Sequence, residues 1–374
     1  MKTNNNIPAY RFQGYTDAWE LRKIFEIADR FNNLRVPIAS SLRIPGSTPY
    51  YGANGIQDYV EGYTHNGEFV LIAEDGANDL KNYPVNLVNG KIWVNNHAHV
   101  LQGKENITNN KFLAYSINRA NIEALLVGGG RAKLNSDVLM NIKLEIPSLK
   151  EQEVIGTFFS TLDRHITLHQ RKLDTLKEQK KTYLKLLFPA KGQTKPALRF
   201  QGFEDDWEEV KLSDMILHEI KGKAKSEMLG SSAVYLETEY LNGGTKSFVD
   251  CEKDVEEDDI LILWDGSQAG TVYHGFSGAL GSTLKAYRPK ESGKFIYYQL
   301  VSHQNLIFEK YRTPNIPHVI KTFTDEFHMF YTSHPEQEAI GSFFQTLDQE
   351  ISQVEDKLAS LKEMKKTLLR KLFV

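Results

Sequence analysis

Apolar residues recur at alternating steps of four and three along two segments of the chain, 148–194 and 334–374, and this is the spacing of a heptad seam. In the first segment the seam runs through Leu162, Ile166, His169, Leu173, Leu176, Lys180, Tyr183 and Leu187. In the second it runs through Leu347, Ile351, Val354, Leu358, Leu361, Lys365, Leu368 and Leu372. A single amphipathic helix of this kind is marginal in water. The pattern therefore predicts two long helices that pack as a coiled coil, and the alternative is that each stripe packs on its own domain.

The lysines of the two seams, Lys180 and Lys365, occupy the same heptad position. A matched polar residue in an apolar seam favours a shared seam with a set register. The step from Leu162 to Leu187 covers about 37 Å at roughly 1.5 Å per residue. That length is close to the roughly 34–36 Å of one turn of B-DNA, so such a rod can hold two domains in successive major grooves.

Before each long helix the pattern changes to an alternation of period two. Strands are predicted for the runs EFVLIAE, KIWVNN and HAHVLQ in 1–147, and for DDILILWDG, GTVYHGF and STLKAYRP in 195–333. Helices are predicted for NKFLAYSINRANIEALL and GKFIYYQLVSHQNLIFEKY, which hold the same relative place in the two segments. We therefore expect an α+β fold with two mixed α/β domains, 1–147 and 195–333, each followed by a long helix.

Two stretches of sequence occur twice. RFQGYTDAWE at 11–20 recurs as RFQGFEDDWE at 199–208, and EQEVIGTFFSTLD at 151–163 recurs as EQEAIGSFFQTLD at 336–348. The segments between them are dissimilar, and the period is far longer than the 20–50 residues of a solenoid repeat, so a duplicated domain is indicated. Because both decapeptides keep Arg, Phe and Trp, we predict that these three residues seat each domain against the helices.

The composition is that of an ordinary folded chain, with 374 residues, 41% hydrophobic content and one cysteine, Cys251. A single cysteine excludes an internal disulfide framework and fits a reducing compartment. The first ten residues lack the apolar core of a signal peptide, and no apolar run is long enough for a membrane span, so we expect a cytoplasmic protein. The net charge of −3 argues against a nucleic-acid binder unless a local basic surface or a basic partner compensates.

The ordered set of motifs resembles the specificity subunit of type I restriction–modification enzymes. The resemblance covers nearly the whole chain and depends on the duplicated decapeptide and the duplicated helix start EQEVIG/EQEAIG. It also depends on PGSTPYYG at 45–52 and on GALGSTLKAYRP at 278–289.

This resemblance implies that 1–147 and 195–333 are target recognition domains, each reading one half of an asymmetric bipartite site on double-stranded DNA. It implies that the helices of 148–194 and 334–374 pack as an antiparallel coiled coil, related by a pseudo-twofold, and set the spacer between the half-sites. The chain itself would catalyse nothing and bind no cofactor. It would direct two methyltransferase subunits and restriction subunits, and these partners would use S-adenosylmethionine, ATP and Mg.

Catalytic motifs were sought and not found. The chain lacks the Asn/Asp-Pro-Pro-aromatic motif of adenine methyltransferases and the G-x-x-x-x-G-K-[ST] phosphate loop, and Gly128–Gly130 has no dinucleotide-binding context. His97 and His99 are predicted on one strand face without a third metal ligand. The acidic run at 250–259 is predicted as a solvated loop away from DNA.

Candidate DNA-contacting residues in the first domain are polar side chains on segments that Gly and Pro hold in place. They are Arg43, Ser47, Thr48, Tyr50 and Tyr51 in a predicted turn, Asn95, Asn96, His97 and His99, and Arg131 and Lys133 after three glycines. Asparagine can pair bidentately with adenine, and glycine lets a backbone approach phosphate. The alternatives are a structural turn with its tyrosines packed inward and a helix C-cap at Gly128.

The second domain offers candidates in four segments: Lys221, Lys223 and Lys225; Ser267 and Gln268; Ser282, Thr283 and Lys285; and Arg312, Asn315 and His318. Lysine and arginine suit phosphates, while the amides and hydroxyls suit base edges. A solvated charge patch is the alternative for the lysines. For the whole chain, the alternative function is a coiled-coil scaffold that joins two protein-binding domains and never meets DNA.

Overall fold

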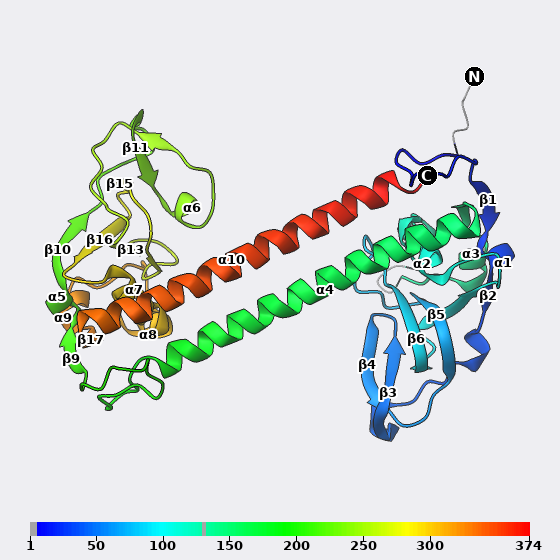
Figure 1. Ribbon diagram of the computed structural model, residues 1–374, viewed down its shortest axis with the longest axis horizontal. Helices are drawn as coiled ribbons and strands as arrows, with labels where there is room; N and C mark the ends of the chain where they lie inside the picture. The colour runs from blue at the N-terminus through cyan, green and yellow to red at the C-terminus, as the bar shows by residue number, and fades with distance from the viewer. Residues whose placement is uncertain (1–5, 129–131) are drawn as a thin grey trace. The chain divides into compact units, whose positions relative to one another are not determined.

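The computed structural model describes residues 6–128 and 132–374, and the chain divides into two compact units. Unit 1 consists of Met1–Gln170 together with Asp356–Val374, and unit 2 is Arg171–Glu355. Both long helices are shared between the units (Figure 1): α4 (Leu149–Leu186) begins in unit 1 and ends in unit 2, and α10 (His334–Lys371) does the reverse. Each unit therefore contains the start of one long helix and the end of the other.

Unit 1 is built on a six-stranded sheet of order β2-β7-β5-β6-β3-β4. The strands are β2 (Ala28–Arg30), β3 (Pro45–Gly52), β4 (Gly55–Val60), β5 (His65–Ala73), β6 (Val85–Val94) and β7 (Ala98–Gly103). Neighbours are antiparallel except β3 and β6, which are parallel. A second small sheet pairs β1 (Glu20–Lys23) with β8 (Lys143–Ile146). The helices are α1 (Ile24–Ile27), α2 (Asn110–Arg119) and α3 (Ser136–Met140), with 3-10 turns η1 (Asn32–Leu34), η2 (Ser40–Leu42) and η3 (Glu123–Leu125).

Unit 2 divides its strands among three sheets, of orders β10-β16-β13-β14, β12-β11-β15 and β17-β9. The strands are β9 (Glu208–Lys211), β10 (Ile216–Lys221), β11 (Leu229–Leu236), β12 (Phe248–Val249), β13 (Ile260–Leu263), β14 (Val272–Tyr273), β15 (Ala279–Leu280), β16 (Leu284–Pro289) and β17 (His328–Tyr331). The helices are α5 (Leu212–Met215), α6 (Thr238–Leu241), α7 (Gly293–Ser302), α8 (Gln304–Lys310) and α9 (Phe323–Glu326).

The predicted strands and helices are confirmed at the level of element type. The alternating runs of the first domain lie in β5, β6 and β7, and those of the second lie in β13, β14 and β16. The predicted helices correspond to α2, and to α7 and α8. Helix α2 stops at Arg119 because Ala120 is extended, with φ −65° and ψ 140°.

The predicted turn over 45–52 is wrong, since this stretch is strand β3. Its side chains alternate in burial, with Thr48 and Tyr50 inside and Ser47 outside, which is the period of a strand rather than a turn. Proline is tolerated because Pro45 is the first residue of the strand. Gly46 allows close approach to β4, because a Cβ there would lie 2.4 Å from the carbonyl oxygen of Val60.

The coiled-coil prediction is confirmed inside each unit. Every seam residue of both helices is buried or half-buried, while the flanking positions are largely exposed. In unit 1, Lys365 pairs with Asp163 at 2.6 Å and Lys362 donates to Gln170 at 3.3 Å, so the two helices run antiparallel there. Their outer faces are polar, and no helix among the described residues is long and apolar enough to cross a membrane.

The repeated decapeptide fastens each unit to the start of its long helix, as predicted. Arg11 forms a bidentate ion pair with Glu151, at 2.8 and 2.7 Å, and Arg199 repeats it on Glu336 at 2.7 and 2.8 Å. The two glutamates are 1% and 0% exposed.

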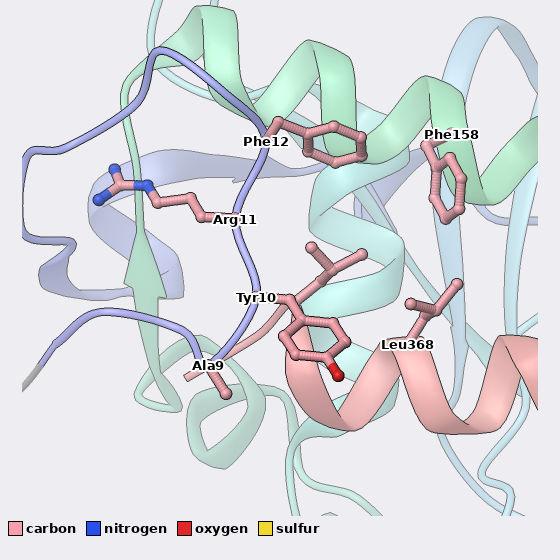
Figure 2. A pocket seen from close by; sticks show the side chains of 7 residues that line it. Ala9, Tyr10, Arg11, Phe12, Phe158 and Leu368 are labelled. Carbon is pink, nitrogen blue, oxygen red and sulfur yellow. The ribbon is translucent and has the colours of Figure 1, made fainter.

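Aromatic residues of the decapeptide complete this attachment. Phe12 packs on Phe158 of α4, with ring centroids 5.6 Å apart, and Leu368 of α10 lies opposite them across an open pocket (Figure 2). Trp19 is buried edge-on to Phe112 of α2 and to Phe373, which follows α10. The core of unit 1 is therefore closed by residues from both ends of the sequence. In unit 2 the same places are taken by Phe200 on Phe343, and by Trp207 between Phe295 and Phe188, the latter following α4.

Candidate nucleic-acid interface

The four polar segments predicted in unit 2 lie side by side, because backbone hydrogen bonds join them into one surface. The bonds are Ser282 N to Ala224 O at 3.0 Å, Trp264 N to Thr283 O at 2.8 Å, Gly266 N to Pro317 O at 3.0 Å and Val319 N to Trp264 O at 2.9 Å. Segments 220–225, 264–270, 281–285 and 311–319 therefore form one continuous patch, which we call the unit 2 surface. Sequence alone could not bring these segments together, since no local pattern links them.

Most predicted residues of the unit 2 surface are open to solvent. The exposed ones are Lys221, Lys223, Lys225, Ser267, Gln268, Ser282, Thr283 and Asn315, and the half-buried ones are Lys285, Arg312 and His318. The exposed set contains three ammonium groups, an amide on each of two loops and three hydroxyls. This combination suits both phosphate contact and base-edge contact.

The half-buried cations of this surface are occupied by neighbours. Lys285 lies 2.6 Å from Glu219 and 3.4 Å from the centre of the Trp264 ring. Arg312 donates to the carbonyl of Ser267 at 3.2 Å and lies over the ring of Phe308. Both side chains hold the loops in position while part of each remains accessible.

The predicted segments of unit 1 also converge. Asn95 N donates to Tyr51 O at 3.1 Å, Glu74 N to His97 O at 2.8 Å and Leu134 N to Glu74 O at 2.7 Å. We call the patch formed by 43–51, 95–99 and 133–134 the unit 1 surface. Arg131 lies outside the described residues, as do the last two of the three glycines.

Glu74 is the centre of this arrangement, and sequence reasoning missed it. It pairs with Arg35 at 2.7 Å and with Lys133 at 3.0 Å, and it lies 3.4 Å from Nδ1 of His99. Burial pushes the pKa of Glu74 upward, but hydrogen bonds from Arg35 and Lys133 outweigh it and the net pKa shift is downward. Glu74 is thus an anion that fixes the lysine of the surface.

The predicted residues of unit 1 divide by exposure. Ser47, Asn96 and Lys133 are exposed; Arg43, Tyr51 and His97 are half-buried; Thr48, Tyr50, Asn95 and His99 are buried. A buried side chain cannot reach DNA in this conformation, so the last four support the surface from beneath it. The inward tyrosine that the sequence left as an alternative is what Tyr50 shows, with 1% exposure.

The buried polar residues have specific partners. The Tyr50 hydroxyl accepts from Ile38 N at 3.0 Å, and the Arg43 guanidinium lies 4.1 Å from the centre of its ring. Asn95 accepts from His97 N at 2.8 Å, so its amide oxygen is already engaged and cannot read adenine as expected. The exposed neighbour Asn96 is the amide that faces solvent.

The two histidines of this strand end are held apart in function. His97 pairs with Asp75 at 2.5 Å, whereas Nε2 of His99 lies 2.8 Å from the Leu134 carbonyl oxygen. Burial lowers the pKa of His99 and keeps the ring neutral, so the nitrogen facing Leu134 carries the proton. Within the described residues, no three His, Cys, Asp or Glu side chains form a metal-binding cluster.

The acidic run at 250–259 is only partly the solvated loop that the sequence predicted. Asp259 is 1% exposed and forms a bidentate pair with Arg288, at 2.9 and 2.6 Å. Asp254 accepts from Leu280 N at 2.8 Å. These carboxylates brace β13 and β15, and the exposed remainder of the run is Asp250, Glu252, Lys253 and Glu256–Asp258.

Comparison with known proteins gives a match over most of the chain. The family described as "Type I restriction modification DNA specificity domain" matches residues 16–178 and again 204–363. The two matches cover both domains and much of both long helices, in agreement with the duplicated sequence.

Individual relatives agree over shorter stretches. S.HindORF215P of Haemophilus influenzae, named as a type I restriction enzyme specificity subunit, is 48% identical over 162 residues, which are 43% of this chain and 41% of that protein. The MjaVIII specificity subunit of Methanocaldococcus jannaschii is 31% identical over 180 residues, 45% of this chain and 42% of that protein. The matches thus span about two fifths of the length of these curated relatives. The crystal structure of a type I restriction-modification S subunit from M. genitalium matches with a TM-score of 0.76 and 20% identity, covering 98% of this chain and 99% of that one, which shows the shared fold.

Proposed function

This chain belongs to the family of type I restriction–modification DNA specificity domains, and from that membership we propose that it is the DNA-reading subunit of such a complex. Each unit reads one half of a bipartite site through its own surface. The chain performs no chemistry on DNA. It positions two methyltransferase subunits, and restriction subunits where the system has them, which act on the bound site in the cytoplasm.

The observation that carries the proposal is the combination of a repeated frame with two unlike surfaces. Both units use the same arginine–glutamate attachment and the same seam, and the family match falls on both. Their polar surfaces share no residue pattern: asparagine, tyrosine and histidine dominate in unit 1, whereas lysines and hydroxyls dominate in unit 2. Unlike surfaces on like frames support an asymmetric site with two different halves.

Contacts are assigned by the chemistry of the exposed side chains. Lys221, Lys223 and Lys225 suit phosphates, and Asn96, Gln268 and Asn315 suit base edges. A lysine-to-alanine change should weaken binding to all sequences alike, whereas an amide-to-alanine change should cost about 1–3 kcal/mol and relax one position. The net charge of −3 fits a subunit that leaves much of the phosphate contact to its partners. DNA binding by this chain alone should accordingly be weak and strongly salt-dependent.

The long helices set the spacer in this proposal. Each contains 38 residues and carries one continuous seam, so their length fixes how far apart the two half-sites must be. The antiparallel pairing inside each unit supports this role.

The test is to co-express the chain with a methyltransferase subunit in a host that lacks adenine methylation, and to sequence the methylated genome. We expect one bipartite, asymmetric motif with a fixed spacer. A stable complex that leaves no such motif would overturn the proposal, and would favour the scaffold alternative.

A further inference from the structure

Unit 1 contains a cluster in which three charged or polar side chains join three helices. Nζ of Lys365 on α10 lies 2.6 Å from Oδ1 of Asp163 on α4. The hydroxyl of Tyr115 on α2 donates to the other oxygen of Asp163 at 2.7 Å. The ammonium also lies 5.6 Å from the centre of the Tyr115 ring. We call this cluster the first junction.

Unit 2 repeats the cluster with the two long helices exchanged. Lys180 on α4 lies 2.5 Å from Asp348 on α10, and the hydroxyl of Tyr298 on α7 donates to Asp348 at 2.9 Å. Lys180 lies 5.5 Å from the centre of the Tyr298 ring. This second junction arises from different surrounding sequence, so its recurrence marks a requirement of the frame.

The junctions are sheltered enough for their charges to matter. The side chains of Lys180 and Lys365 are 22% and 28% exposed, and those of Asp348 and Asp163 are 33% and 35% exposed. Burial and the adjacent carboxylate raise the pKa of Tyr115 far above its ordinary value, so its hydroxyl stays a donor at physiological pH. Each aspartate therefore has one oxygen on a lysine and the other on a tyrosine.

An apolar seam alone does not define one register. If α10 slid by seven residues along α4, about 10 Å, leucines would again face leucines and the apolar burial would be nearly unchanged. The slide would put a leucine, Leu358 or Leu372, where Lys365 now meets Asp163. A polar group matched to one partner excludes this alternative.

We propose that the two junctions fix the register of α4 against α10 and, through Tyr115 and Tyr298, the seat of each domain on that register. They are positioning residues that determine which spacer lengths the protein accepts. The inference rests on the proposed DNA-reading function.

Other ion pairs between the long helices provide a matched control. Lys172 lies 2.8 Å from Glu350 and Lys177 lies 2.6 Å from Glu355, and these side chains are 45–54% exposed. Such pairs are screened by water and contribute little. The contacts that define them involve no side chain from a domain.

The experiment uses the complex with its methyltransferase subunit and reads genome methylation, in which every spacer length is available. For Lys365→Asp we expect methylation of sites with the original half-sites but a spacer one base pair shorter or longer to rise about tenfold relative to the original spacer. Lys180→Asp should act in the same way through the second junction. Lys172→Glu, the control, should leave the spacer distribution unchanged.

Exchange of the charges separates a positioning role from general damage. Lys365→Asp combined with Asp163→Lys rebuilds the ion pair in reverse and should restore the original spacer. Tyr115→Phe keeps the ion pair but removes the tie to α2, and should broaden spacer use by less than Lys365→Asp.

The outcomes are distinguishable. If Lys365→Asp and Lys180→Asp retain the wild-type spacer distribution, the junction proposal is wrong while the DNA-reading function stands. If Lys365→Asp abolishes methylation, recovery by the exchange supports the proposal and failure to recover contradicts it. A wild-type complex that methylates no bipartite motif overturns both.

Discussion

At the scale of single residues, the structure explains what the repeated decapeptide does. Its arginine in each copy satisfies both oxygens of a glutamate that is essentially inaccessible to water, Glu151 or Glu336. A buried carboxylate without its partner is expensive, because little solvent is available to stabilise the charge. The decapeptide therefore does not read DNA; it makes the start of each long helix a fixed part of its domain.

Replacing Arg11 by alanine should lower the free energy of unfolding of unit 1 by about 3 kcal/mol, because Glu151 is left as an unpaired buried charge. Urea unfolding followed by hydrogen exchange in unit 1 peptides measures the change. Arg22→Ala is the control, since the Arg22–Glu20 pair is solvent-exposed and its loss should not be detectable. Equal effects of the two changes would contradict this reading of the ion pair.

Unit 1 should lose stability as the pH falls below neutrality. Burial lowers the pKa of His99 in the folded state, whereas an unfolded histidine titrates near pH 6.5, so acid favours the unfolded chain. The contribution is complete above pH 6.5 and is lost as the pH falls from there toward the lower folded value. His65 shifts in the same direction because it too is buried.

Thermal unfolding between pH 7.5 and 5 measures this dependence. The slope should be at most about 1.4 kcal/mol per pH unit for each histidine. His99→Gln should reduce the slope, and an unchanged slope in that variant would show that His99 does not contribute.

At the scale of elements, the long helices and most strands follow from local periodicity, and this is why sequence alone could predict them. A seam of period 3.5 and a strand of period two are properties of neighbouring residues. Strand β3 was mistaken for a turn because Pro45, Gly46 and Pro49 are turn residues in most contexts, and its pairing partners are distant in sequence. Junction lysines were recognisable as exceptions in the seam, but their aspartate and tyrosine partners were not.

Lengthening both long helices by one heptad should widen the spacer of the recognised site while leaving its two halves unchanged. The inserted residues add about 10 Å to each helix and preserve the seam. Methylome sequencing of the co-expressed complex reads the new spacer directly. An insertion in α4 alone should abolish specific methylation because the seams no longer match, and an unchanged spacer in the double insertion would exclude the ruler role.

At the scale of the whole molecule, neither compact unit corresponds to one half of the repeat. Unit 1 takes the end of α10 and unit 2 takes the end of α4, so the aromatic residue after each long helix closes the core of the other domain. Sequence analysis found the repeat but not this exchange, because the contacts of Phe188 and Phe373 join residues that no local pattern connects. For the same reason the Glu74 cluster was missed, and Tyr50, Asn95 and His99 were assigned to the surface although they are buried.

Changing Phe373 to alanine should destabilise unit 1 by about 3–5 kcal/mol and leave unit 2 unaffected, because the ring packs against Trp19, Phe112 and Phe159. Phe188→Ala is the matched variant and should have the opposite distribution, since that ring packs in unit 2. Hydrogen exchange resolved by peptide measures both units in the same sample. Loss of protection in both units from either change would show that they do not unfold separately.

The exchange of helix ends imposes an order in time. Unit 2 is one uninterrupted stretch, residues 171–355, and everything it needs has been made once the ribosome passes it. Unit 1 begins at the other end of the sequence, yet its core stays open until residues 356–374 have been synthesised. The amide of Tyr10 must wait for the carbonyl oxygen of Lys371, its partner at 2.8 Å. The domain translated first is thus completed last, and a nascent chain interrupted after unit 2 carries an unfinished first domain that chaperones and proteases can recognise.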